Sequence, residues 1–253
     1  MLIRSKRLTV VHAFSTREGG VSEGPFASLN LGRSVGDDPE RVAENARRFA
    51  ERLGITPGQI VSANQVHGET ILEVAGAEPG PLIPPALGDA DGLVTRARGV
   101  ALGIRTADCV PVLLHAPDVQ AIAAVHAGWR GAVVGIAGKA VARLTELYGA
   151  DPGKMVAVIG PHIRSCCYEV GPDVASRFEA RFGVGVARPS GQGREASRLD
   201  LEEANRRALT EAGILAENLE ALPECTCCDP KRFFSHRRDQ GRSGRHLSVI
   251  AIG

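Results

Sequence analysis

Apolar residues recur along this chain with two different periods, which predict helices in some segments and strands in others. The clearest helix follows Asp38-Pro39-Glu40, where a capping aspartate and a first-turn proline precede apolar residues at helical spacing as far as Gly54. The same spacing predicts helices over 132–148, 173–182 and 200–212. Short apolar runs predict strands over 9–14, 60–63, 70–74, 92–95, 100–104, 155–159 and 247–252.

A β-hairpin is predicted in the middle of the chain. The runs 110–115 and 120–125 are almost entirely apolar and are separated by a turn at Pro117-Asp118, which is typical of strands buried on both faces. Cys109 and His126 stand at the two outer ends. If the strands are antiparallel, these two residues lie close together although they are seventeen positions apart.

The order of these elements predicts the fold class. Helices interspersed with strand pairs favour an α/β (α+β) fold, in which a mixed β-sheet has helices packed on its faces. The segments 15–36, rich in glycine and serine, and 78–88, with four prolines, are predicted as loops. Because there is no internal repeat and no linker, we expect a single domain over 1–253.

Composition and charge narrow the possible partners. Of the 253 residues 43% are hydrophobic, which permits a well-filled core. The net charge of +1 provides no overall field for nucleic acid or membranes, so any anion must be recognised locally. Charges interrupt the first residues, and no apolar run reaches the roughly 18 residues of a membrane span. We therefore expect a cytoplasmic protein without nucleic-acid or membrane partners.

Five of the six cysteines fall into two clusters, Cys166-Cys167 and 225–228, while Cys109 stands apart. This distribution differs from that of a small disulfide-stapled scaffold, so we expect reduced thiols. The cysteines of 225–228 are compatible with a second metal site or a redox pair. Adjacent cysteines do not easily face one ion, however, so we expect buried structural thiols there. Cys109 becomes the first candidate for chemistry.

Three turns each carry a residue that can bind a metal, namely His67, Cys109 and His126. Two imidazoles and one thiolate would leave the fourth position of a tetrahedral zinc open, as in a catalytic site. Spacing alone does not exclude a buried cysteine beside two ordinary histidines. A metal-free alternative is a hydrolase in which the Cys109 thiolate attacks, His126 is its partner and His67 stabilises charge.

Sequence motifs resemble those of the YfiH-type, or laccase-domain, family. The matching segments occur in order from residue 14 to the C-terminus: 14–22, 28–32, 35–38, 65–68, Arg105-Thr106-Ala107-Asp108-Cys109-Val110-Pro111, His126-Ala127-Gly128-Trp129-Arg130-Gly131, 159–161, 167–171 and Phe233-Phe234-Ser235-His236-Arg237-Arg238-Asp239. The resemblance implies a zinc-dependent purine nucleoside phosphorylase with adenosine deaminase activity. It also implies that His67, Cys109 and His126 are the zinc ligands.

Phosphorolysis of adenosine, inosine or methylthioadenosine needs an anionic nucleophile under the sugar and stabilisation of the departing base. Side chains in or beside the matched motifs are therefore candidates for binding phosphate and nucleoside: Arg17, Asn30, Gln65, Arg105, Arg130 and Arg238. For deamination, Asp108 is a candidate to relay a proton to or from a zinc-bound water. Each arginine also has an ordinary alternative as a solvated surface residue.

Other activities are compatible with the same residues. Seven histidines without a His-x-His pair cannot supply the copper cluster of a multicopper laccase. A single copper in place of zinc, with weak polyphenol oxidation, is compatible with the three ligands. Members of the family have also been linked to peptidoglycan editing, which here would be a Cys109-dependent hydrolysis. A binding module without turnover is the non-enzymatic alternative.

Overall fold

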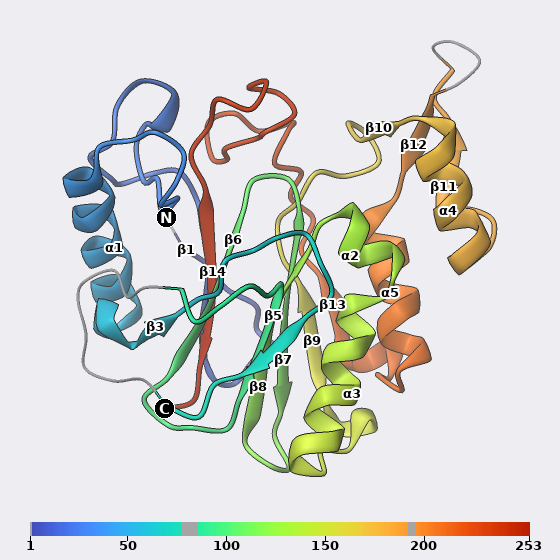
Figure 1. Cartoon of the computed structure of the whole chain (residues 1–253), viewed down its shortest axis with the longest axis horizontal. Helices are drawn as coiled ribbons and strands as arrows, with labels where there is room; N and C mark the ends of the chain where they lie inside the picture. Colours follow the sequence, from blue (N-terminus) through green and yellow to red (C-terminus); the bar gives the residue numbers. More distant parts are fainter. Residues whose placement is uncertain (1, 77–85, 192–195) are drawn as a thin grey trace.

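Two β-sheets packed face to face form the centre of the computed structural model, which describes residues 2–76, 86–191 and 196–253 (Figure 1). The six-stranded sheet has the order β13-β9-β7-β8-β5-β4, with strands Leu219–Ala221, Val156–Ile159, Val110–Ala116, Ala121–Ala127, Gly92–Thr95 and Ile71–Glu73. The five-stranded sheet has the order β1-β2-β14-β6-β3, with strands Leu2–Ile3, Val11–Ser15, His246–Ala251, Ala101–Thr106 and Ile60–Val61. Both sheets contain parallel and antiparallel pairs.

Helices cover the outer faces of the two sheets. Helix α1 (Pro39–Leu53) packs outside the five-stranded sheet, and α2 (Trp129–Val133), α3 (Ile136–Tyr148) and α5 (Leu201–Glu211) lie on the side of the six-stranded sheet (Figure 1). Helix α4 (Pro172–Phe182) adjoins a small antiparallel sheet of β10 (Glu169–Val170), β12 (Ser197–Leu199) and β11 (Ala187–Pro189). The predicted mixed α/β class is confirmed, but the central sheet is divided into two.

Strand alternation explains this layering. In β7, Val112 and Leu114 point toward the helices, whereas Leu113 points toward the second sheet, where it packs in a cluster with Phe14 and Ile104. Every residue of β7 and β8 is buried. A sheet covered on one side by helices and on the other by a second sheet has no face for polar side chains, which is why this hairpin is so apolar.

The predicted helix boundaries are confirmed with one exception. Helix α1 has the expected caps, since the Asp38 side chain accepts a hydrogen bond from the Glu40 backbone N–H at 2.8 Å and Gly54 ends the helix at φ +75°. The helix predicted over 132–148 is wrong at its start. Gly135, at φ +73°, separates α2 from α3, because a left-handed residue breaks the ladder of helical hydrogen bonds.

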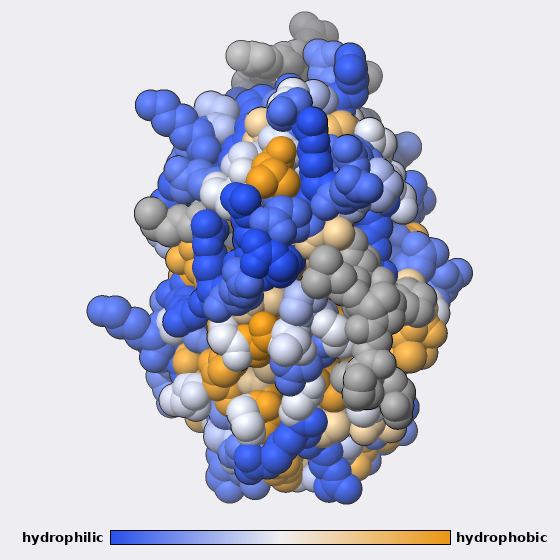
Figure 2. Space-filling model, turned by 90° about the vertical axis from the view of Figure 1, so that its left-hand side faces the viewer, coloured by the Kyte–Doolittle hydropathy of each residue, from blue (hydrophilic) through white to orange (hydrophobic). Residues whose placement is uncertain are grey.

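The outer face of α1 is hydrophilic, as expected for a helix that buries one side only. Figure 2 views the molecule from this side and shows a mostly hydrophilic surface with scattered hydrophobic residues. Exposed ion pairs such as Arg47 with Glu44 and Glu51 lie on this helix. In the described part of the chain, no helix combines the length and apolarity needed to cross a membrane. Most of the predicted loop 78–88 falls outside the described residues.

Candidate metal centre

The predicted hairpin places two of the three candidate ligands side by side. Strands β7 and β8 are antiparallel, and Pro111 pairs with His126. Cys109 immediately precedes β7, so its side chain lies at the same end of the hairpin as that of His126. His67 reaches this end from the loop between β3 and β4.

The three side chains form one compact set of donors. One ligand atom from each of His67, Cys109 and His126 lies within 4.8 Å of the others. Cys109 Sγ is 3.9 Å from His67 Nε2, and the two imidazole ring centres are 4.9 Å apart at an interplanar angle of 82°. Two nitrogens and one sulfur at these separations fit a tetrahedral ion with one open position.

Asp91 supports this set and was missed by the sequence analysis. It lies just before β5 and is fully buried, and its carboxylate is 2.7 Å from His126 Nδ1. It also accepts backbone hydrogen bonds from His67 at 3.0 Å and Gly68 at 2.6 Å. A carboxylate on Nδ1 leaves Nε2 of His126 for a metal ion. An aspartate directly before a buried apolar strand was the available signal.

The protonation of the site favours metal binding by the thiolate. Burial raises the pKa of Cys109, but His126 and His67 outweigh this effect and bring the pKa down to about 6. Burial lowers the pKa of His126, but Cys109 and Asp91 outweigh it and raise the pKa to about 9. Without a metal, the two pKa shifts together favour the thiolate of Cys109 beside the protonated form of His126. A bound metal would replace the proton on His126.

The backbone at Gly128 lies close to the side chains of two candidate ligands. A methyl group on Gly128 would lie 2.7 Å from His67 Cδ2 and 3.3 Å from Cys109 Sγ. His67 itself adopts φ +59°, and Asp108, beside Cys109, adopts φ +86°. Left-handed backbone at two non-glycine residues is uncommon and is typical of functional sites.

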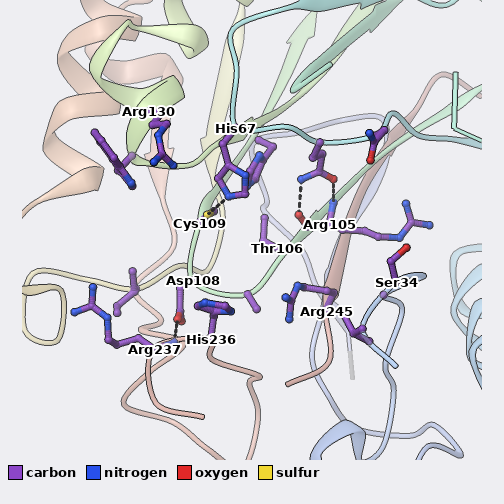
Figure 3. Close-up of a pocket in the computed structure, with 18 of the residues that line it drawn as sticks. Ser34, His67, Arg105, Thr106, Asp108, Cys109, Arg130, His236, Arg237 and Arg245 are labelled. Carbon is purple, nitrogen blue, oxygen red and sulfur yellow. Dashed lines mark hydrogen bonds between the residues drawn. The ribbon is translucent and has the colours of Figure 1, made fainter. Parts of the chain in front are cut away.

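The three candidate ligands open into a pocket of about 680 Å³. This volume lies in the range of small-molecule sites. Figure 3 shows His67 and Cys109 between Arg130 on one side and Arg105 and Arg245 on the other. Trp129 also lines the pocket, with the Arg130 guanidinium 4.6 Å above its ring.

Three of the six predicted substrate-binding residues line this pocket, namely Gln65, Arg105 and Arg130. The Gln65 side-chain amide forms two hydrogen bonds with the Arg105 backbone. Its Oε1 accepts from Arg105 N at 2.8 Å, and its Nε2 donates to Arg105 O at 2.7 Å. Arg105 donates to Leu31 O and to Ser62 Oγ. Burial, with a smaller effect from Arg33, lowers the pKa of Arg105 to about 9.

Arg17, Asn30 and Arg238 are not among the residues that line the pocket. Arg17 stacks on Phe234 and donates to the Ala27 carbonyl. Asn30 is fully buried and bonds Asp37. Arg238 pairs with the Asp239 carboxylate and donates to the carbonyl groups of Thr226 and Phe233. Their side chains hold loops together outside the pocket lining, and their role in binding substrate stays a prediction.

Asp108 lines the pocket, but both of its carboxylate oxygens are engaged by the protein. Oδ1 accepts from Thr226 Oγ1 at 2.6 Å, and Oδ2 accepts from Ser235 Oγ at 3.0 Å and from the Arg237 backbone N–H at 2.7 Å. These bonds tie the 226–237 loop to the residue next to Cys109. This arrangement fixes the position of the Asp108 carboxylate, and its role as a proton relay stays a prediction.

The pocket is also lined by three arginines that were not predicted from the sequence, namely Arg33, Arg237 and Arg245. Burial lowers the pKa of both Arg33 and Arg245, and Arg33 Nε is buried without a hydrogen-bond partner. Within the described ranges, none of the five pocket arginines forms an ion pair with a carboxylate: Arg33, Arg105, Arg130, Arg237, Arg245. Guanidinium groups gathered without counter-charges favour binding of an anion.

Comparisons with known proteins identify relatives over almost the whole chain. Residues 11–253 match a family model described as multi-copper polyphenol oxidoreductase laccase. The chain is 41% identical over 251 residues to a purine nucleoside phosphorylase of Deinococcus radiodurans. The aligned region covers 99% of this chain and 92% of the relative. It is 39% identical to the purine nucleoside phosphorylase YlmD of Geobacillus stearothermophilus, over 95% of this chain and 89% of the relative.

Solved structures share the whole fold. The crystal structure of YlmD from Geobacillus stearothermophilus matches with a TM-score of 0.93 at 37% identity, covering 99% of this chain and 95% of that one. The Bacillus licheniformis hypothetical protein YfiH matches with a TM-score of 0.91 at 35% identity, covering 96% and 92%.

Proposed function

The chain belongs to the family described as multi-copper polyphenol oxidoreductase laccase, as its motifs predicted, and from this premise we propose that it is a zinc-dependent purine nucleoside phosphorylase. One observation carries the proposal. A His-Cys-His set of metal donors and five arginines without carboxylate partners line the same pocket. We also propose that residues 1–253 form one domain, which the match to a relative over 99% of the chain supports.

The arginines suit the nucleophile of this reaction. In phosphorolysis a phosphate oxygen forms a bond to C1′ of the ribose while the bond from C1′ to the purine nitrogen breaks, and the electron pair leaves with the base, which takes up a proton. Arg33, Arg105 and Arg245 would bind the phosphate through charge-assisted hydrogen bonds. Because their charges are partly desolvated, their attraction for an anion is stronger than at the surface.

His67, Cys109 and His126 would hold the metal. When bound there, zinc would supply a Lewis acid with one position open to a substrate oxygen. The protein orients the set through Asp91, which fixes the His126 ring and the backbone at His67. Copper(II) binds such ligands more tightly than zinc, so metal availability would decide which ion occupies the site.

We extend the proposal to adenosine deamination at the same pocket. Deamination replaces the purine amino group by a hydroxyl from water and releases ammonia, so it needs a group that moves a proton. Asp108 lines the pocket and is the candidate for moving this proton, and the three hydrogen bonds that it accepts would hold its carboxylate in position.

Product analysis tests the proposal. The zinc-loaded protein is incubated with adenosine or inosine, with and without phosphate, and the products are separated by chromatography. We expect free base and ribose-1-phosphate only when phosphate is present, inosine from adenosine by deamination, and loss of all products in Cys109→Ala. The variant Arg47→Ala, on the exposed face of α1, is the matched control for surface charge. Turnover that is independent of phosphate and of metal would contradict the proposal.

The pair of Cys109 and His126 supports a second candidate, a cysteine hydrolase acting on an amide such as a cell-wall precursor. Their pKa values, about 6 and about 9, describe a thiolate beside an imidazolium. Chelation separates the two candidates. The phosphorylase loses activity when the metal is removed, whereas the hydrolase gains it because the thiolate is freed. Alkylation of the metal-free protein should then abolish the hydrolase activity, and bound zinc should protect against it.

A further inference from the structure

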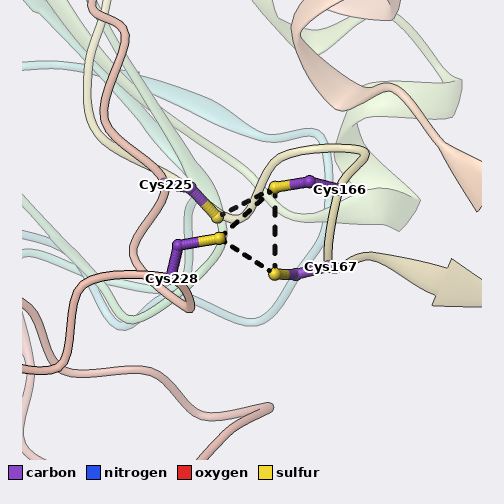
Figure 4. A group of neighbouring side chains, drawn as sticks. All are labelled: Cys166, Cys167, Cys225 and Cys228. Atoms are coloured by element: carbon purple, nitrogen blue, oxygen red, sulfur yellow. Dashed lines mark hydrogen bonds between the residues drawn. The ribbon is translucent and has the colours of Figure 1, made fainter.

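Four cysteines from two distant segments meet beside the pocket, two of them exposed at the surface. Cys166 and Cys167 lie in the turn before β10, and Cys225 and Cys228 lie in the turn after β13. Figure 4 shows the four sulfurs directed toward one another, and all lie within 4.8 Å. Cys225 is buried but Cys228 is exposed, so the expectation of buried structural thiols over 225–228 is wrong for Cys228. Cys166 is also exposed.

The spacing of the sulfurs fits a single ion. Four thiolates about 2.3 Å from a tetrahedral zinc are about 3.8 Å from one another. The sulfur of Cys166 is 3.8 Å from that of Cys167, 3.7 Å from that of Cys225 and 3.5 Å from that of Cys228, and Cys167 and Cys228 are 3.2 Å apart. In an iron–sulfur cluster the cysteines bind different irons, which requires wider separations.

The local backbone also resembles that of a metal-binding turn. Cys225 and Cys228 have the C-x-x-C spacing common to zinc sites. The Cys225 sulfur accepts a backbone hydrogen bond from Arg164 at 3.4 Å, and others from Cys227 and Cys228. Such N–H groups stabilise thiolate charge around an ion. The adjacent Cys166 and Cys167 complete the set from the opposite segment.

We propose that Cys166, Cys167, Cys225 and Cys228 bind a second zinc ion in a closed, four-thiolate structural site. Binding exchanges the thiol protons for one Zn²⁺ and involves no change of oxidation state. The choice of zinc follows from four soft ligands in a tetrahedral arrangement and from the lack of an open position. This site shares no residue with the His67, Cys109 and His126 set. The inference can therefore be right or wrong whatever the outcome for the proposed function.

The position of the cluster gives the second ion a role. Tyr168 follows Cys167 and lines the pocket, with the Arg237 guanidinium 5.0 Å above its ring. Thr226 follows Cys225 and holds the Asp108 carboxylate. An ion bound to the four cysteines would join these two segments and so fix one wall of the pocket. A structural zinc of this kind contributes directly to folding stability.

Metal analysis of cysteine variants tests the inference. The protein is purified without oxygen and its metal content per chain is measured in wild type, Cys109→Ala, Cys228→Ser and the double variant Cys109→Ala/Cys228→Ser. We expect about two zinc ions in wild type, about one in each single variant and none in the double variant. The control is Cys227→Ser, which removes the neighbouring thiol outside the set and should leave the wild-type content unchanged.

Cobalt(II) substitution of the wild-type chain provides a readout that does not depend on a variant folding. Charge-transfer absorption and visible bands of a four-thiolate cobalt site are expected, and they should persist in Cys109→Ala. Zinc content unaffected by Cys228→Ser would overturn the inference. So would iron in place of zinc at these cysteines, or a Cys167–Cys228 disulfide in the anaerobically purified protein.

Discussion

The Asp91 carboxylate lies 2.7 Å from His126 Nδ1, and both side chains are buried. Burial raises the pKa of Asp91, but the hydrogen bond from His126 and the backbone donors of Gly68 and His67 outweigh it and lower the pKa. One carboxylate thus orients a ligand on β8 and the loop that carries another. The geometry of the candidate metal centre consequently depends on a residue that is not itself among the candidate ligands.

The first prediction concerns this residue. Asp91→Asn should weaken zinc binding about 10- to 100-fold, since a ligand histidine loses its orienting carboxylate. Competition against a fluorescent chelator measures the affinity. The matched control is Asp89→Asn, which alters an exposed aspartate bonded to Asn64, and its zinc affinity should equal that of the wild type. Equal affinities for all three proteins would show that Asp91 does not act on the metal site.

The second prediction concerns the space around the ligands. Gly128→Ala should reduce zinc content strongly, because its Cβ would lie 2.7 Å from His67 Cδ2. Gly171→Ala is the matched control, because both glycines are N-cap residues with extended backbone. At Gly171, however, nothing lies within 4 Å of the added Cβ. Metal analysis and thermal unfolding distinguish loss of the ion from loss of the fold. Full zinc content in Gly128→Ala would contradict the geometry of the site.

The third prediction concerns the anion. Arg33→Ala should raise KM for phosphate about tenfold, which corresponds to about 1.4 kcal/mol of lost binding. Thermal stability should not fall, because the change also removes the repulsion between Arg33 and Arg105. Steady-state kinetics at varied phosphate measure the effect, with Arg47→Ala as the control. An increase confined to KM for the nucleoside would place Arg33 at a different part of the substrate.

The fourth prediction concerns stability at acid pH. Burial lowers the pKa of His246 to about 3, while the unfolded chain has an ordinary histidine near 6.5. The unfolded state therefore takes up a proton between these values and the folded state does not, so the free energy of unfolding falls as the pH drops from about 6.5 toward 3. His12, His115 and His162 contribute in the same direction, because burial lowers their pKa values.

Urea denaturation at pH 7 and pH 5 checks this prediction. In the wild type, the Phe234 backbone N–H donates to His246 Nε2 at 2.8 Å. His246→Gln keeps an acceptor for this hydrogen bond but removes the group that titrates. The loss of stability between the two pH values should be smaller by up to about 1.36 kcal/mol per pH unit. His236→Gln, at an exposed position, is the control and should keep the wild-type dependence. If the free energy of unfolding of His246→Gln changed with pH as much as that of the wild type, His246 would not cause the loss of stability at acid pH.

Local patterns predicted the parts of this protein whose contacts are near in sequence. The caps of α1 and the apolar hairpin of β7 and β8 follow from neighbouring residues, and the hairpin by itself joins Cys109 to His126. The sequence motifs further identified the family and indicated His67. Helical periodicity did not reveal the break at Gly135, because a glycine is tolerated both inside a helix and between two helices.

Only the tertiary structure decided which distant residues share the pocket. Arg33 and Arg245 line it while Arg17 and Arg238 hold loops, although all four come from polar turns with little to distinguish them in sequence. Likewise, Cys228 meets Cys166 and Cys167 rather than forming a set with Cys227. The physical reason is that periodicity and turn residues specify local backbone, whereas the partner of a loop side chain depends on how two sheets and their helices pack.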